Sequence, residues 1–350
     1  MGKTRQSGPI RDMALDLGTS TTLVAARGRG ILLRAPSVAA VDRHTGQVLR
    51  LGEEARELLG RTPAEVLAVR PLEGGVLRDQ TLGESMVRGF LQQAAPGRAF
   101  RPRLLLSVPT GARQVDERAV VDAALGAGAR KVCLMEAPLA AALGAGLDIG
   151  EPKGRMVVDV GGGVTDAAII ALGAVAASVC LPAAGDAFDR ALIRYVREEK
   201  NVDVGRRAAE GLKVAVGRVG PGEKGAPFSV KGRCRTTGLP REIALTAGET
   251  AEALAPVAAE LLRGVLEVLE RAPGSLAADA AAEGILLTGG GCQLRGLDAF
   301  LAEGTGLPIR RAEDPETTVV LGLEQALDTL SRRQEGVLDL ARRRAVAGEV

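Results

Sequence analysis

The scarcity of aromatic, histidine and cysteine side chains excludes several kinds of functional site. The 350 residues include no Trp, one Tyr, five Phe and a single His, His44. Few rings remain for the bases of single-stranded nucleic acid to stack on, and one His excludes a His-rich metal site. No two of the four Cys form a C-x-x-C pair, which argues against a zinc ribbon or a redox dithiol. Free thiols suit a reducing cytoplasm, the location that we predict.

An excess of either charge is also missing. Lys and Arg number 45 against 43 Asp and Glu, a net charge of +2, so we predict no nucleic-acid partner. Residues 1–11 are polar and basic, without the apolar stretch of a secretory signal. Residues 167–185 carry no charge and are long enough to cross a bilayer, but they are rich in Ala and interrupted by Gly173. They predict two buried strands joined at Gly173.

Glycine is abundant, with 46 residues, and two of its clusters lie in segments that share one pattern. Residues 13–24 and 156–167 both read as an apolar strand, an Asp, one apolar residue, a Gly turn, a Thr and a second apolar strand. The repeat predicts an α/β chain made of two similar halves. A length of 350 residues leaves room for two or three domains.

The two turns are candidate phosphate sites. Glycine lets several backbone N–H groups converge on a phosphate, and hydroxyl groups add donors. The candidate contacts are Gly18, Thr19, Ser20 and Thr21 in one turn and Gly161, Gly162 and Gly163 in the other. Asp16 and Asp159 precede the turns, where a carboxylate suits a hydrated Mg²⁺ that takes few protein ligands. Two ordinary hairpins, each with a structural Asp, are the alternative interpretation.

Three further features are candidates for parts of the same site. The run Thr288-Gly289-Gly290-Gly291-Cys292-Gln293 follows a buried strand, where bare backbone can contact a flat ring or a phosphate. Glu136 ends a strand and could orient a water for attack on a terminal phosphate, or simply start a helix. Glu210 and Lys213 are three apart on a helix and could flank a ribose and a phosphate, or form an exposed pair.

Hydrophobic periodicity predicts the surrounding elements. Strands are expected at residues 104–109, 131–135 and 285–288, and strand with loop over 217–240. Helices are expected at residues 114–128, 139–145, 187–199, 206–216 and 251–271. Asp186 is expected to cap the helix that begins at residue 187.

Taken in chain order, these motifs resemble those of the actin, sugar-kinase and heat-shock chaperone ATPase superfamily. The phosphate-1, connecting, phosphate-2 and adenosine motifs would be Asp16-Leu17-Gly18-Thr19, Glu136-Ala137-Pro138, Asp159-Val160-Gly161-Gly162-Gly163 and Thr288-Gly289-Gly290-Gly291. Over residues 13–327 the chain is most similar to the bacterial actin family of MreB and Mbl. Further segments that carry this resemblance are Leu59-Gly60-Arg61-Thr62-Pro63, Arg70-Pro71-Leu72-Glu73-Gly74-Gly75-Val76, Ala184-Gly185-Asp186, Thr237-Gly238-Leu239-Pro240, Leu294-Arg295-Gly296-Leu297-Asp298 and Ala312-Glu313-Asp314-Pro315.

The resemblance implies an actin-like α/β fold around a cleft that holds ATP and Mg²⁺. The first half would be residues 1–150 plus 320–350, with an insert at 34–76, and the second half 151–319, with a small subdomain at 185–244. Asp16 and Asp159 would order the metal's waters, and Glu136 the attacking water. The phosphates, the nucleoside and the base would be contacted by the two turns, by Glu210 and Lys213, and by Gly289, Gly290, Gly291, Cys292 and Gln293.

The resemblance also implies filaments, formed by copies of the chain, that organise cell-wall synthesis. Paralogues of the MreB type and membrane proteins of cell-wall synthesis would be partners. Four departures concern the site: Thr21 replaces an Asn, Val164 a Thr, Asp166 a Glu, and Ala137 the second of two acids. The loss at Ala137 weakens the case for hydrolysis more than that for binding. Ala99-Phe100 offers little apolar area, so membrane contact would be weak for one subunit.

Two alternatives therefore stay open beside a polymerising ATPase. One is a nucleotide-binding scaffold with little turnover that co-assembles with an active paralogue. The other is a small-molecule kinase on the same fold, which would need a catalytic base and a polar substrate pocket in the cleft.

Overall fold

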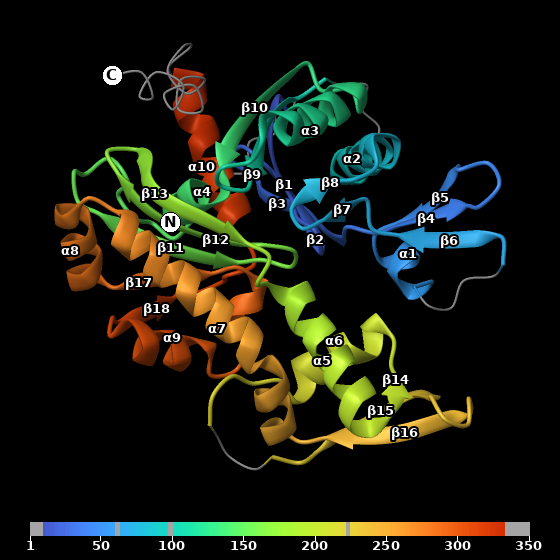
Figure 1. Cartoon of the computed structure of the whole chain (residues 1–350). Coiled ribbons are helices and arrows are strands. Elements are labelled where there is room, and N and C mark those ends of the chain that lie inside the picture. Colours follow the sequence, from blue (N-terminus) through green and yellow to red (C-terminus); the bar gives the residue numbers. More distant parts are fainter. Residues whose placement is uncertain (1–9, 60–63, 97–100, 222–224, 333–350) are drawn as a thin grey trace.

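The computed structural model describes residues 10–59, 64–96, 101–221 and 225–332 (Figure 1). Four of the sequence expectations lie wholly or partly outside these residues. They concern the polar N-terminus before residue 10, Gly60-Arg61-Thr62-Pro63, Ala99-Phe100 and residues 333–350 of the expected first half.

Two five-stranded sheets form the body of the molecule. The first sheet has the order β10-β9-β1-β2-β3, and the second has the order β13-β12-β11-β17-β18. The strands of the first sheet are β1 (Asp12–Leu17), β2 (Thr21–Ala26), β3 (Gly30–Pro36), β9 (Arg103–Val108) and β10 (Lys131–Glu136). Those of the second sheet are β11 (Arg155–Val160), β12 (Thr165–Ala171), β13 (Ala174–Leu181), β17 (Ile285–Thr288) and β18 (Ile309–Arg311).

The two sheets share one topology. In the first, β1 pairs antiparallel with β2 and parallel with β9; in the second, β11 pairs antiparallel with β12 and parallel with β17. The register places Asp16 opposite Leu23 and Asp159 opposite Asp166. The duplication that the sequence pattern predicts is therefore present. Residues 167–185 include most of β12 and all of β13, with Gly173 between them. No described helix is long and apolar enough to cross a membrane.

Helices cover both sheets (Figure 1). The helices α2 (Gln80–Ala94) and α3 (Gln114–Gly126) pack beside the first sheet, and α7 (Ala247–Arg271), α8 (Gly274–Glu283) and α9 (Leu297–Thr305) beside the second. The predicted helix at 251–271 begins four residues earlier than expected. Thr246 and Glu249 form a reciprocal capping box there, which satisfies backbone N–H groups of the first turn.

Two small units extend from the sheets (Figure 1). The insert sheet, of order β5-β4-β6, consists of β4 (Ala39–Asp42), β5 (Val48–Leu51) and β6 (Val66–Val69) and packs on α1 (Glu53–Glu57). It is followed by the hairpin of β7 (Leu72–Glu73) and β8 (Val76–Leu77). The other unit holds α5 (Gly185–Lys200), α6 (Arg206–Val216), β14 (Val202–Asp203), β15 (Phe228–Cys234) and β16 (Pro240–Leu245).

The start of α5 differs from the prediction. Its N-cap is Ala184, and Asp186 lies within the first turn. The Asp186 carboxylate does not cap the helix because it is held by two arginines, Arg70 and Arg206. Asp186, which the sequence predicted as a helix cap, instead forms ion pairs with side chains from other elements.

The chain links the sheets through two helices that cross in close contact. These are α4 (Ala137–Gly144) and α10 (Thr318–Arg332). Gly144 lies against the backbone of Thr318, and Gly322 lies against the backbone of Ala140, with no room for a Cβ at either glycine. Side chains from both sheets and both helices form one hydrophobic cluster at this crossing.

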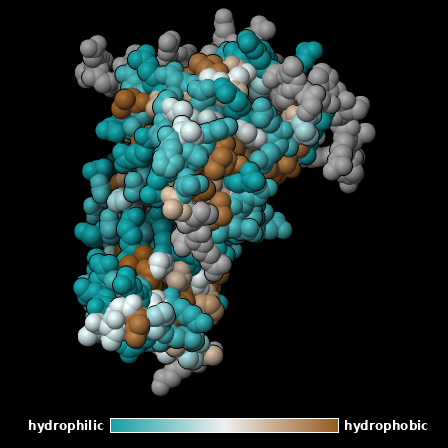
Figure 2. Space-filling model, turned by 90° about the vertical axis from the view of Figure 1, so that its right-hand side faces the viewer, coloured by the Kyte–Doolittle hydropathy of each residue, from teal (hydrophilic) through white to brown (hydrophobic). Residues whose placement is uncertain are grey.

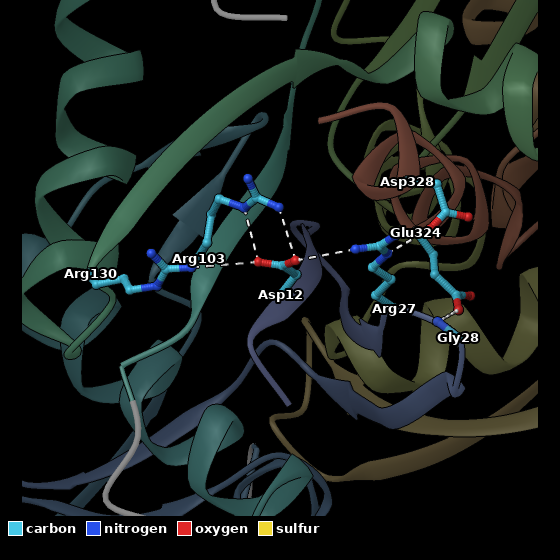
Figure 3. Close-up of polar contacts among 7 residues, drawn as sticks. All are labelled: Asp12, Arg27, Gly28, Arg103, Arg130, Glu324 and Asp328. Carbon is cyan, nitrogen blue, oxygen red and sulfur yellow. Dashed lines mark hydrogen bonds and ion pairs between the residues drawn. The ribbon is translucent and has the colours of Figure 1, made fainter. Parts of the chain in front are cut away.

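A charged network fastens α10 to the first sheet (Figure 3). Glu324 of α10 accepts hydrogen bonds from the N–H groups of Gly28, in the turn between β2 and β3, and Gly30, at the start of β3, at 3.0 and 3.1 Å. Arg27 beside this turn donates to Asp328 at 2.6 Å and lies 3.9 Å from Asp12. Asp12 in turn accepts a 2.9 Å hydrogen bond from Arg103 of β9. The network joins the first strand of the fold to its last described helix.

Candidate functional site

A cavity of about 660 Å³ lies between the two sheets, at the carboxyl ends of β1, β11 and β17. Ligands of open α/β sheets bind at such edges because the loops that follow the strands converge there. The predicted site residues that line the cavity come from both halves of the chain. They are Asp16, Gly18, Thr19, Ser20, Thr21, Asp159, Gly161, Gly162, Gly163, Glu210, Lys213, Gly289, Gly290, Gly291 and Gln293.

The two predicted phosphate turns meet at this cavity. The first turn, residues 18–21, joins β1 to β2, and the second turn, residues 161–164, joins β11 to β12. Gly162 lies against the side chain of Ser20, and Gly163 against that of Thr19, so neither glycine has space for a Cβ. Only bare backbone allows two turns to approach this closely. Their backbone N–H groups and hydroxyls therefore gather at one place.

Three carboxylates, Asp16, Asp159 and Asp166, lie behind the turns. Burial raises the pKa of Asp16 to about 6, although a hydrogen bond from Ser107 (2.6 Å) opposes the shift. The pKa of Asp159 is raised well above its ordinary value by burial and then by the negative charges of Asp166 and Asp16. Burial raises the pKa of Asp166 to about 7. The negative charges of Asp166 and Asp16 that act on Asp159 are the kind of repulsion that a bound cation would relieve.

Glu136 does not line this large cavity. It lines a second, smaller cavity of about 230 Å³, while its neighbour Ala137 lines the larger one. The Glu136 carboxylate accepts a hydrogen bond from the hydroxyl of Thr110 at 3.0 Å, which holds it there. Thr110 also donates its backbone N–H to Asp166 at 2.8 Å. Thr110 therefore connects the predicted catalytic Glu136 to a carboxylate that does line the large cavity.

Lys213 and Glu210 line the cavity together on α6, as the sequence predicts. The ammonium group of Lys213 lies 2.7 Å from Oδ1 of Asp189 on α5 and donates to the carbonyl oxygen of Gly185 at 3.1 Å. Burial raises the pKa of Asp189, and the charge of Lys213 opposes the rise. Sequence analysis missed Asp189, three residues after Asp186 on the same helix, because its role depends on how α5 packs on α6.

The third glycine-rich segment forms a 3₁₀ turn, η1 (Gly290–Gln293), after β17. Gly289 has φ +80° and approaches the backbone of Val160, which a side chain would prevent. Cys292 is the exception among the predicted contacts, because its side chain is fully buried in the core beside the second sheet. Gln293 donates to Glu316 at 2.7 Å, and Glu316 also pairs with Arg34 of β3. Sequence analysis missed both Glu316 and Arg34, which line the cavity.

Comparison with known proteins identifies the family. The sequence model of the family described as MreB/Mbl protein matches residues 10–335. The chain belongs to the MreB/Mbl family. The cell shape-determining protein Mbl of Bacillus subtilis (strain 168) is 40% identical over 323 residues, which cover 92% of this chain and 97% of that protein. The cell shape-determining protein MreB of Escherichia coli (strain K12) is 42% identical over 325 residues, 91% and 94% of the two chains.

Solved structures show the same actin-like fold. MreB5 of Spiroplasma citri bound to AMPPNP has a TM-score of 0.88 at 30% identity and covers 94% of this chain and 99% of its own. The MamK double helical filament has a TM-score of 0.75 at 19% identity, with 91% and 99% coverage, and shows the fold alone. The fold and the family that the sequence motifs predict are both confirmed.

In this MreB/Mbl chain, Asp16 and Asp159 are the carboxylates that would hold a Mg²⁺ through its waters. No group of three or more His, Cys, Asp or Glu side chains in the described part of the chain is arranged to hold a metal ion by itself. Mg²⁺ keeps most of its waters and takes one or two carboxylates together with substrate phosphates. Asp16 and Asp159, beside the two turns, match that donor set.

Proposed function

We propose that this cleft binds ATP or ADP with Mg²⁺, and that nucleotide binding controls assembly of the chain into filaments that help determine cell shape. The observation that carries the proposal is the meeting of two hairpin turns, each from a separate sheet and each preceded by an Asp, at one cavity. The solved MreB5 relative binds AMPPNP and ADP, and the curated relatives are cell shape-determining proteins.

Different lining residues would contact the phosphates, the ribose and the base of the nucleotide. The backbone N–H groups and hydroxyls of both turns would hold the phosphates, because such nests of donors favour anions. Lys213 and Glu210 on α6 would flank the ribose, and the bare backbone of Gly290 would lie against the base with Gln293. Mg²⁺ would neutralise phosphate charge, and Asp16 and Asp159 would accept hydrogen bonds from its waters.

We further propose that ATP is hydrolysed slowly. Phosphoryl transfer needs a positioned water and stabilised charge rather than covalent catalysis. Glu136 is held by Thr110, and Asp166 is held by the same residue on the cavity side. Glu136 and Asp166 together would orient the attacking water, because position 137 holds an Ala instead of a second acid. Because Glu136 does not line the large cavity, the geometry equally favours a low-turnover scaffold as the second candidate.

Assembly would follow from the way that nucleotide joins the two halves of the cleft. A ligand that contacts both phosphate turns favours the closed form, and a polymer contact that also prefers the closed form is then coupled to the nucleotide.

Figure 2 shows one side of the molecule as largely hydrophilic with small separate hydrophobic areas. Paralogues, membrane proteins of cell-wall synthesis and a weak peripheral contact with the membrane are the further partners that we propose.

The test is pelleting over a range of protein concentrations with Mg-ATP, Mg-ADP or no nucleotide, with released phosphate measured in the same tubes. A critical concentration that is lowest with Mg-ATP, with phosphate release, supports the polymerising ATPase. Pelleting without release supports the scaffold. Absence of pelleting at every concentration contradicts the filament proposal, and absence of binding to a fluorescent ATP analogue contradicts the proposal for the cleft.

A matched pair of variants tests the role of Glu136. Glu136→Gln should lower phosphate release about tenfold or more, because an amide cannot accept a proton from water. Glu117→Gln, in the same smaller cavity, should leave release within about twofold. Equal rates in the two variants would remove Glu136 from the mechanism.

A further inference from the structure

Three polar side chains that line the large cavity form a chain of contacts between the two sheets. Arg34 of β3 pairs with Oε2 of Glu316, and Gln293 of η1 donates to Oε1 of the same carboxylate at 2.7 Å. Arg34 belongs to the first sheet, whereas Gln293 follows β17 of the second sheet. Arg34, Glu316 and Gln293 are here called the Glu316 cluster.

The Glu316 carboxylate is held beside Gly290, the residue proposed to lie against the base. The preceding carbonyl oxygen, that of Pro315, accepts hydrogen bonds from the N–H of Gly289 at 2.9 Å and from the hydroxyl of Thr288 at 3.1 Å. A Cβ added to Gly290 would lie 3.3 Å from Cγ and 3.7 Å from Oε1 of Glu316. A base that lies against Gly290 is therefore within reach of this carboxylate.

The bond to Glu316 determines which atom the amide of Gln293 can offer to a ligand. A primary amide carries two donor hydrogens on its nitrogen and one acceptor oxygen. Nε2 of Gln293 donates to Glu316 at 2.7 Å and, more weakly, to the carbonyl oxygen of Gly290 at 3.5 Å. Both donors are therefore used within the protein, and the acceptor Oε1 is the atom that remains for a ligand.

Arg34 balances the charge of Glu316 from the side away from Gln293. The guanidinium binds Oε2 and the amide binds Oε1, so they contact different oxygens of the carboxylate. The side chains of Arg34 and Glu316 are 55% and 30% exposed, and such a partly solvated pair contributes little to folding. An ionised carboxylate has acceptor atoms only. The part of the Glu316 cluster beside Gly290 thus offers acceptor oxygens from two side chains.

We propose that the Glu316 cluster selects adenine over purines with a carbonyl oxygen at the same ring position. Glu316 and Gln293 are the specificity-determining residues, and Arg34 is the positioning residue that holds Glu316. The proposal rests on the proposed binding of ATP and ADP in the cleft. The exocyclic amino group of adenine carries two N–H donors, one for each side-chain oxygen. Guanine and hypoxanthine carry a carbonyl oxygen there, an acceptor that would meet two acceptors.

Glu316 also limits how the site can adapt to a carbonyl oxygen. A glutamine without such a neighbour can rotate its amide and donate an N–H to the ligand. In Gln293 that rotation would give up the 2.7 Å bond and place Oε1 against the Glu316 carboxylate. A polar group left without its partner costs more than a typical hydrogen bond contributes. Discrimination between the bases therefore depends on the charge of Glu316 as well as on Gln293.

The test is the ratio of the dissociation constants of Mg-IDP and Mg-ADP, measured by calorimetric titration of the full-length protein below the concentration at which it pellets. The two nucleotides share ribose, phosphates and Mg²⁺ and differ in the base, hypoxanthine against adenine. The wild type should bind Mg-ADP about tenfold more tightly, the value of one hydrogen bond to a partly exposed charged group. Mg-GDP should bind about as weakly as Mg-IDP. A wild-type ratio below about twofold, or tighter binding of Mg-IDP or Mg-GDP, would overturn the proposal.

Glu316→Gln and Glu267→Gln form a matched pair. In Glu316→Gln the ratio should fall to about threefold or less, because an amide at this position can donate to a carbonyl oxygen and no longer fixes Gln293. Arg34→Gln should lower the ratio in the same direction. Glu267 pairs with Arg271 on α7, is 38% exposed and does not line the cavity, so Glu267→Gln should keep the wild-type ratio. An unchanged ratio in Glu316→Gln would refute the proposal.

Gln293→Leu keeps the proposal testable where Glu316→Gln does not fold by circular dichroism. Gln293 is exposed, and the substitution removes the amide oxygen while Glu316 and Arg34 stay in place. The ratio should again fall to about threefold or less. A wild-type ratio that persists in Gln293→Leu would contradict the assigned role of the amide. Failure of the wild type to bind any of the three nucleotides is a separate result, which contradicts the proposed function of the cleft instead.

Discussion

Asp166 shows how a single buried carboxylate can set the pH response of the molecule. It is 3% exposed and lies opposite Asp159 in the hairpin of β11 and β12. Burial raises its pKa from 3.8 to about 7, against the opposing hydrogen bonds from the Thr110 N–H and the Cys180 thiol. The folded protein therefore binds a proton at Asp166 between about pH 4 and 7 that the unfolded chain has released.

Stability that depends on this proton is lost as the pH rises toward 7. The unfolded state binds fewer protons in that window, so the free energy of unfolding falls with increasing pH. In Asp166→Asn, relative to wild type, we expect the free energy of unfolding to rise by on the order of 2 kcal/mol between pH 4.5 and 8. Urea unfolding of both proteins without nucleotide or Mg²⁺ across this range measures the difference.

Asp42→Asn is the control for this experiment. Hydrogen bonds from Thr45 and then His44 lower the pKa of the exposed Asp42 carboxyl, the opposite direction to Asp166. The stability that this acid contributes is lost only as the pH falls through its lowered pKa, so the difference from wild type should be constant from pH 5 to 8. A constant difference in Asp166→Asn as well would contradict the raised pKa of Asp166.

Single residues also show where sequence analysis reached its limit. The two turns were predictable because glycine, hydroxyl and Asp residues are adjacent in the chain and have few other uses together. Asp189 and Glu316 were not, because their partners Lys213 and Arg34 lie far away in sequence and meet them only in the folded chain. Cys292 was predicted as a contact from its position, whereas its side chain faces the core.

At the scale of elements, α4 and α10 cross with their backbones in close contact. Both helices carry glycine where their backbones meet, at Gly144 and Gly322. Gly322→Ala would place a methyl group against the carbonyl oxygen of Ala140. The backbone of α4 cannot easily move away to relieve this clash. We expect a loss of about 3 kcal/mol or more in the free energy of unfolding. Urea or thermal unfolding followed by circular dichroism measures it.

Gly211→Ala provides the matched control within α6. Its nearest neighbour is a ring carbon of Phe228, 4.0 Å from the added Cβ, so the methyl group has room. Alanine in a helix interior should stabilise the protein by about 0.5 to 1 kcal/mol relative to glycine. A neutral Gly322→Ala would show that α10 can move away from α4, and the joint would then be looser than its packing indicates.

Elements with strong local signals were predicted best. The helix at 206–216 and the strand at 285–288 agree with α6 and β17 at both ends, because apolar periodicity and flanking glycines mark them. The predicted start of α5 was wrong because the carboxylate of Asp186 pairs with arginines from other elements instead of capping the backbone N–H groups of its own helix. The sequence also could not predict that Glu136 lies outside the large cavity, because its position depends on a hydrogen bond from Thr110 in another loop.

At the scale of the whole molecule, the two duplicated sheets share one hydrophobic cluster. The cluster around α4 and α10 contains Ala14 and Leu105 of the first sheet together with Val157 and Leu286 of the second. All four are buried, and the cluster touches both helices. Unfolding either sheet would expose part of the core of the other. The cost of such exposure, about 25 cal/mol per Å² of apolar surface, couples the two halves.

We therefore expect the nucleotide-free protein to unfold in one calorimetric transition, with equal calorimetric and van't Hoff enthalpies. A nucleotide that contacts both phosphate turns should raise that single transition without splitting it. At a hundred times its dissociation constant, Mg-ADP should raise the midpoint by about 5 °C, because binding to the native state alone adds about 2.7 kcal/mol. Two transitions, with the nucleotide shifting only one of them, would show that the crossing of α4 and α10 is a flexible link rather than a shared core.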